Sequence, residues 1–367
     1  MNSGSSSRDH ECCNKVIRDT IVRLDFQRQR LLNLVVDPHE DKQDSYPTVQ
    51  GAVTLTTFFQ QYGLLGLLSF SCVTADDLPD IRSVPPDIQV PAFTEGEPSA
   101  GKRIRQTLPD WKDTRVYHVL HLPENWHADG AEYPVLVEWA GNGGYSNAFG
   151  DVSIGRPEGS QLGYGLSAGR DFIWLCLPYL NNDGNDIAIN WWGDPPTYDP
   201  EPTLRYCRSA VEAVCRDYRG DRKRVVLCGF SRGAIACNYL GLHDDETSRL
   251  WCGFIAYSHY DGARNWPYPG SDRQSARLRL NRLGDRPQFI CSEGNGAESV
   301  REYLMPLVPQ ANLTFTSTGF RSTTLPDSRV PAPCRFSQKH SSWRMPDETK
   351  SSCDAVPGGW AQQASRD

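Results

Sequence analysis

The sequence predicts an α/β protein, with a mostly parallel central sheet and helices on both faces. Two observations lead to this prediction. Between residues 101 and 320, short and nearly continuous apolar runs of strand length recur, and segments with helical periodicity lie between them. Strands that are apolar along their whole length are typical of parallel sheets buried on both faces, because each side chain then faces a covering layer.

Each expected element follows from its own pattern. Val135-Leu136-Val137 is apolar on both faces of a strand, whereas Leu204, Cys207 and Val211 share one side of a helix. The expected strands are 116–120, 135–139, 172–177, 225–228, 253–257, 288–291 and 313–316; the expected helices are 203–218 and 232–242, with a further helix from Glu298.

Length and charge exclude several classes of protein. A chain of 367 residues can bury a sizeable core and holds one large domain or two small ones. The net charge of −7 argues against a nucleic-acid partner, which calls for clustered Lys and Arg. No stretch approaches the roughly 18 apolar residues of a membrane-spanning helix. The twelve cysteines contain no CxxC pair, and several lie in apolar runs, so we expect no metal site.

The chain divides into four parts. Residues 1–75 are an N-terminal extension whose last segment, 63–75, has the length of a signal-peptide apolar region and ends in small residues. This favours a secreted or periplasmic protein. The alternative is a buried helix of a cytoplasmic protein, because the run begins late and no Lys or Arg precedes it closely. Residues 76–100 are a linker or extended arm, 101–325 form the main domain, and 326–367 are a flexible tail.

The most informative motif is Gly229-Phe230-Ser231-Arg232-Gly233, which matches G-x-S-x-G. An apolar strand precedes it and a small-residue helix follows it at once, as a nucleophile elbow requires. Ser231 would then lie at a helix N-terminus, which favours developing negative charge. The simpler alternative is a strand–turn–helix connection whose glycines only close the turn.

A second glycine-rich segment, Ala140-Gly141-Asn142-Gly143-Gly144-Tyr145, follows the strand that ends at Trp139. In proteins with a nucleophile elbow, the loop after the third strand supplies one oxyanion-hole N–H, and the residue after the nucleophile supplies the other. The candidate donors are therefore the backbone N–H groups of Arg232 and of Asn142 or Gly143. Phosphate binding is the rival interpretation, but neither G-x-G-x-x-G nor a P-loop lysine is present.

Residues 101–320 resemble secreted α/β-hydrolases of the esterase type. This is the group of polyhydroxybutyrate depolymerases and of feruloyl and acetylxylan esterases. The resemblance rests on the elbow at 229–233, the glycine-rich loop at 140–144 and the strand order. The resemblance implies an α/β-hydrolase fold and ester hydrolysis through an acyl-enzyme, with no metal and no cofactor. It does not identify a substrate, although carbohydrate-linked or polymeric esters fit the group.

The expected order of the triad is Ser, then Asp or Glu, then His. Glu293, directly after strand 288–291, is the first choice for the acid, and Asp261, after the preceding strand, is its rival. The histidine should follow the last strand, but the loop after Phe320 contains none. His340 is the remaining candidate further on, and His259 is the alternative on an earlier strand end.

Residues 321–367 are rich in Ser, Thr and Pro and lack apolar periodicity. A flexible tail is one explanation, and a frameshift near residue 321 that replaced a normal final segment is another. If a frameshift occurred, a different reading frame of the gene should encode a histidine within a few codons of Phe320.

The long connection 178–202 carries the aromatic pair Trp191-Trp192. Loops at the carboxyl ends of parallel strands line the ligand crevice, so Trp191, Trp192 and Tyr145 are candidate substrate contacts. The alternative for the tryptophans is packing beneath the loop as a small satellite core.

These features predict a serine hydrolase of carboxylic esters, whose partner is a small-molecule or polysaccharide-linked ester. A serine peptidase of the same fold is one alternative, although its usual N-terminal propeller does not fit in about 100 residues. A non-catalytic binding protein that kept the scaffold and lost the histidine is the other.

Overall fold

The computed structural model describes residues 79–86, 88–143, 147, 149 and 152–320. Expectations for the N-terminal extension, the C-terminal tail, Tyr145 and His340 fall outside these residues. No helix in the described part of the chain has the length and apolar character needed to cross a membrane.

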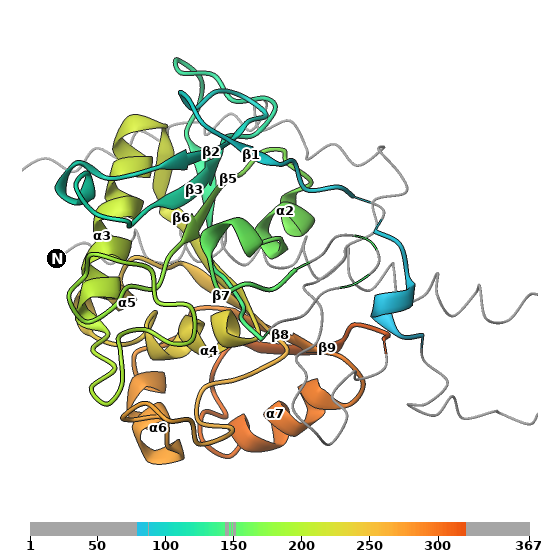
Figure 1. Ribbon diagram of the computed structural model, residues 1–367. Coiled ribbons are helices and arrows are strands. Elements are labelled where there is room, and N and C mark those ends of the chain that lie inside the picture. Colours follow the sequence, from blue (N-terminus) through green and yellow to red (C-terminus); the bar gives the residue numbers. More distant parts are fainter. Residues whose placement is uncertain (1–78, 87, 144–146, 148, 150–151, 321–367) are drawn as a thin grey trace, which may run out of the picture. The chain divides into compact units, whose positions relative to one another are not determined.

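The core is a nine-stranded sheet in the order β1-β2-β3-β5-β4-β6-β7-β8-β9 (Figure 1). Only the pairs β2–β3 and β3–β5 are antiparallel, and all other neighbours are parallel. The strands are β1 (Phe93–Thr94), β2 (Arg103–Gln106), β3 (His118–His121), β4 (Tyr133–Trp139), β5 (Ile173–Leu177), β6 (Gly220–Phe230), β7 (Gly253–Tyr257), β8 (Gln288–Ser292) and β9 (Leu313–Ser317). The predicted mostly parallel α/β sheet is confirmed.

The apolar patterns located the central strands well. β7 has the predicted bounds, and β8 and β9 each extend one residue further. β6 begins five residues before its predicted start. Its first segment, Gly220–Arg224, is mostly polar and so gave no apolar run, and Gly220 pairs with Tyr133 before a shift in register. β2 was not predicted, since its sequence Arg-Ile-Arg-Gln has no apolar run. Phe93–Thr94, in the expected arm, adds the two-residue strand β1 beside it.

Helices cover both faces of the sheet. They are α2 (Leu162–Ser167), α3 (Glu201–Asp217), α4 (Arg232–Tyr239), α5 (Asp245–Ser248), α6 (Arg273–Leu280) and α7 (Gly296–Leu304), with short 3-10 turns η2 (Ile81–Ser83), η3 (Pro109–Trp111) and η4 (Pro157–Gly159). Side chains of α3, α4, α6 and α7 join one core cluster, and those of α2 join the cluster on the opposite face. Every residue of α4 is buried, because this helix packs against β4, β6 and β7.

A buried carboxylate joins β4 to α2. Glu138 Oε1 accepts the backbone N–H groups of Gln161 and Leu162, and Oε2 accepts those of Gly163 and the Trp174 indole, at 2.8–3.2 Å. Burial raises the pKa of Glu138, and these four donors oppose that rise. The side chain thus satisfies the N–H groups at the start of α2, which have no intrahelical acceptor.

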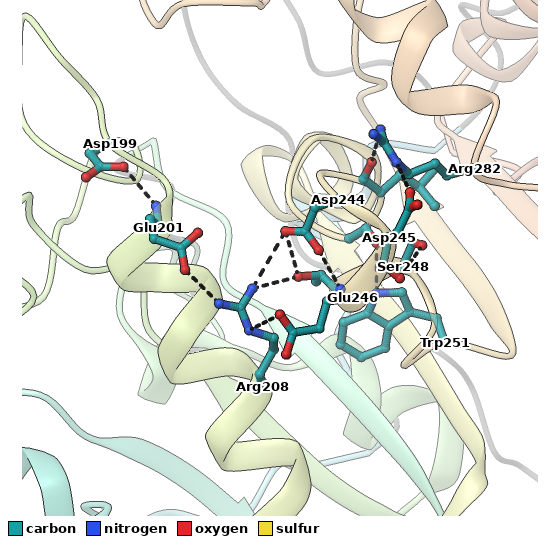
Figure 2. Close-up of polar contacts among 12 residues, drawn as sticks. Asp199, Glu201, Arg208, Asp244, Asp245, Glu246, Ser248, Trp251 and Arg282 are labelled. Carbon is teal, nitrogen blue, oxygen red and sulfur yellow. Dashed lines mark hydrogen bonds and ion pairs between the residues drawn. The ribbon is translucent and has the colours of Figure 1, made fainter.

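On the other face, Arg208 of α3 is held by acidic side chains (Figure 2). Its guanidinium lies 2.6 Å from Glu201, 3.6 Å from Asp244 and 3.6 Å from Glu246. It also donates to Thr247 Oγ1 at 3.1 Å. Arg208 therefore links α3 to α5, which follows the end of α4.

We predict that Glu138→Gln destabilises the protein. The amide group of Gln would place a donor against the N–H groups that the carboxylate now accepts, which leaves buried donors unpaired. We expect the free energy of unfolding to fall by about 2–4 kcal/mol. Urea unfolding measures this change, with Glu132→Gln at an exposed position as the control. Equal losses in the two variants would contradict the role of Glu138.

Candidate active site

The turn between β6 and α4 presents Ser231. Its φ of 55° and ψ of −114° are unusual for a residue other than glycine. Its N–H donates to the Tyr257 carbonyl at 3.0 Å, which holds the strained turn against the end of β7. The Ser231 carbonyl accepts the N–H of Ala234 at 3.1 Å, so the helix begins directly at the serine. Strand, strained serine and helix follow one another as the motif predicts.

The two glycines of the motif are required by close backbone packing. A Cβ on Gly229 would lie 2.3 Å from the carbonyl carbon of Gly233. A Cβ on Gly233 would lie 2.0 Å from the carbonyl oxygen of Trp139, at the end of β4. The elbow can therefore form only where residues without a Cβ stand at both positions.

The glycine-rich loop after β4 lies beside the elbow. A Cβ on Gly141 would be 2.9 Å from Phe230 Cδ1 and 3.0 Å from the Phe230 carbonyl oxygen, one residue before Ser231. Asn142 Nδ2 donates to the Asn190 carbonyl at 2.8 Å, which ties this loop to the aromatic insert. Gly143 is exposed, with a φ of 127°. The two predicted sources of oxyanion N–H groups, this loop and the first turn of α4, are thus brought together.

The side chain of Arg232 has a structural role that the sequence did not reveal. It is 1% exposed, its Nη2 donates to the Gly155 carbonyl at 3.0 Å, and its guanidinium lies 3.8 Å from the centre of the Tyr179 ring. Burial lowers its pKa to about 10. Because the N–H of Gly155 donates in turn to the Gly141 carbonyl, Arg232 connects the elbow through Gly155 to the start of the glycine-rich loop. An arginine within an apolar helix was the only signal in the sequence.

Glu293 lies where the acid of a triad is expected, directly after β8. It is 2% exposed, and its Oε1 accepts a hydrogen bond from the Tyr257 hydroxyl. Burial raises the pKa of Glu293 to about 7, and the bond from Tyr257 opposes that rise. Perturbed acids of this kind are common at functional sites.

His259 lies close to the same position. It follows β7, and its Nδ1 is 3.0 Å from the hydroxyl oxygen of Ser258. The φ of Ser258 is 82°, in the left-handed region. Burial and, to a smaller extent, the charge of Arg264 lower the pKa of His259 to about 4, so the ring is neutral at pH 7. Ser258, His259 and Glu293 line one cavity of about 330 Å³.

Asp261, the rival acid, is engaged elsewhere. Its Oδ2 accepts from Arg279 Nε at 2.8 Å and its Oδ1 accepts from Arg279 Nη2 at 3.1 Å. Burial raises the pKa of Asp261 to about 6, against the opposing charge of Arg279. Both carboxylate oxygens bind α6, so the pair fastens the loop after β7 to that helix. This arrangement favours Glu293 as the acid.

The tryptophan pair divides between core and surface. Trp192 is 0% exposed and stacks on Tyr239 with ring centres 4.4 Å apart, and Tyr268 lies at 4.6 Å. This burial favours the packing alternative for Trp192. Trp191 is half-buried against Tyr268 and Trp266 and keeps part of its surface exposed. Among the described residues, no three His, Cys, Asp or Glu side chains gather as a metal site.

No family model and no curated protein matches the chain. Similar solved structures include a thermostable esterase (14% identity, TM-score 0.40), an acylaminoacyl peptidase from Pyrococcus horikoshii (11%, 0.36) and dipeptidyl peptidase 4 from Porphyromonas gingivalis (14%, 0.39). Each match covers 60% of this chain but only 54%, 36% and 32% of the respective protein. Likenesses this distant carry no argument about activity. The strand order and the strand–Ser231–helix turn are those of the α/β-hydrolase fold.

We predict that Gly233→Ala disrupts the elbow. The new Cβ would collide with the Trp139 carbonyl, so β4 and α4 must move apart. We expect the free energy of unfolding to fall by about 3 kcal/mol, and the structure around Ser231 to be lost with it. Thermal or urea unfolding checks this. Gly130→Ala is the control, because its Cβ would lie 3.2 Å from the His127 carbonyl oxygen, a tight contact that a shift of a few tenths of an ångström relieves. Wild-type stability of Gly233→Ala would refute the close approach.

Glu293 makes stability depend on pH. Because its pKa rises from 4.5 to about 7 on folding, the folded state holds this proton more tightly than the unfolded state. The resulting stabilisation is complete below the unfolded pKa and is lost as the pH rises through about 7. Glu293→Gln cannot ionise, so its stability relative to wild type should increase by about 3 kcal/mol between pH 4 and pH 8. Urea unfolding at both values measures this, and a constant difference would be the contrary result.

Proposed function

We propose that this protein is a serine hydrolase that cleaves carboxylic esters through an acyl-enzyme on Ser231. The observation that carries the proposal is the strained Ser231, with φ at 55°, between two glycines that admit no Cβ. A simple turn has no need of this strain, whereas a nucleophile elbow uses it to expose the hydroxyl.

In the proposed reaction, Ser231 Oγ attacks the ester carbonyl while a histidine accepts its proton. The N–H of Arg232 and that of Asn142 or Gly143 stabilise the oxyanion of the tetrahedral intermediate. Collapse releases the alcohol, which takes the proton from the histidine. Water then attacks the acyl-enzyme with the same histidine as base, and this step frees the acid and restores Ser231.

Glu293 is the proposed acid that orients the histidine and stabilises its charged form. Its position after β8 supports this role, as does the use of both Asp261 oxygens by Arg279. His340 is the proposed base, and His259 is the alternative. The cavity that His259 shares with Glu293 supports the alternative.

We predict that Ser231→Ala abolishes hydrolysis of 4-nitrophenyl butyrate without loss of folding, because the hydroxyl makes no hydrogen bond with any described residue and alanine keeps the Cβ. Rates should fall by about 10³-fold or more. A fluorophosphonate probe should label wild type but not the variant. Ser317→Ala, at the same edge of the sheet, is the control and should keep both activity and labelling. Turnover by Ser231→Ala near the wild-type rate would end the assignment.

The same assay identifies the base. His340→Ala should reduce the rate by about 10³–10⁴-fold, as loss of a triad member does, while His259→Ala retains activity. The reverse pattern would transfer the role to His259. If wild type neither hydrolyses esters nor reacts with the probe, the protein is the non-catalytic binding protein instead.

A further inference from the structure

The cavity beside Glu293 is placed to receive part of a substrate. It has a volume of about 330 Å³ and lies at the carboxyl ends of β7 and β8, where Ser258 and Glu293 line it. The N–H of Ser231 is bonded to the carbonyl of Tyr257, the residue directly before Ser258. The backbone of Ser231 is therefore bonded to the residue that precedes the lining residue Ser258, although Ser231 itself does not line the cavity.

Hydrogen-bond donors predominate in its lining. Arg264 and Arg273 both line it, and neither forms an ion pair with any described residue. The Arg273 guanidinium lies 4.7 Å from the centre of the Tyr303 ring, which holds it against the wall of α7. Trp266 and Tyr303 also line the cavity, and the indole N–H of the first and the hydroxyl of the second have no hydrogen-bond partner among the described residues. Both arginine side chains are exposed, so an anion can reach them from solvent, whereas the donors of Trp266 and Tyr303 are buried, and buried donors normally have acceptors.

Little negative charge opposes these donors. Glu293 is the one carboxyl group among the described lining residues, and its Oε1 already accepts a bond from Tyr257. Burial raises its pKa to about 7, so it is only partly ionised at neutral pH. His259 is neutral there. Two guanidinium charges against one partly ionised carboxyl leave a net charge of at least one positive unit, which matches a monoanion.

We propose that this cavity binds a carboxylate, and that the substrates are therefore esters that carry a free carboxylate group. Guanidinium groups bind carboxylates through short charge-assisted hydrogen bonds, often two at a time. The substrate half of this proposal rests on the hydrolase function proposed for Ser231. The binding half depends only on the cavity.

Binding of a carboxylate is tested with the Ser231→Ala variant, which should not hydrolyse an ester. Titration calorimetry of Ser231→Ala with monomethyl adipate, a monoanion, should show saturable binding, while uncharged dimethyl adipate should bind at least about tenfold more weakly. Arg264→Gln and Arg273→Gln should each weaken binding of the monoanion by about tenfold. Arg277→Gln, on an exposed position of α6 outside the cavity lining, is the matched control. Absence of binding, or equal losses in the control, would overturn the carboxylate site.

The substrate half is tested by competing esters. Wild type should hydrolyse the 4-nitrophenyl monoester of adipic acid with a kcat/KM about tenfold above that of its methyl-capped counterpart, and salt should reduce the preference. The double variant Arg264→Gln, Arg273→Gln should lose the preference, so that its kcat/KM for the charged ester is no higher than for the methyl-capped ester. A preference unchanged in the double variant would overturn the specificity. Binding of the monoanion by a protein that hydrolyses neither ester would reject the hydrolase function and leave the carboxylate site established.

Discussion

The site depends on one close approach, between the start of α4 and the end of β4. The Gly233 position faces the Trp139 carbonyl with no room for a Cβ, and Gly229 faces Gly233 in the same way. These contacts fix where α4 can begin relative to the sheet. Since α4 is buried along its whole length, any shift of the helix would also disturb its packing on β4, β6 and β7. The strain at Ser231 is maintained by this packing.

Buried charges reinforce the same arrangement from both sides. Glu138 joins β4 to α2 one residue before Trp139, and Arg232 joins α4 to the loop after β4. Each is nearly inaccessible to solvent, so each is costly to bury and is retained where its hydrogen bonds hold separate segments together. The geometry around Ser231 is therefore set by interactions between segments that lie far apart in the sequence.

The carboxyl ends of β6, β7 and β8 carry three different candidate catalytic side chains at one edge of the sheet. Ser231, His259 and Glu293 follow these three strands in turn. Burial shifts the pKa of His259 downward and that of Glu293 upward, so near neutral pH His259 is uncharged and Glu293 is only partly ionised. Because Arg264 and Arg273 line the adjoining cavity, this edge combines a nucleophile elbow with a cavity of positive charge.

Apolar periodicity and glycine spacing are local properties of the chain, so the central strands, the helices α3 and α4, and the elbow could be predicted from the sequence. The strand β2 could not, because its polar residues become a strand only through pairing with β3. The folded structure was needed to show that Asp261 pairs with Arg279, that Trp192 is enclosed by aromatic rings, and that Arg232 reaches Gly155. Each of these contacts joins segments that lie far apart in the sequence. No regular spacing of residues along the chain indicates such partners.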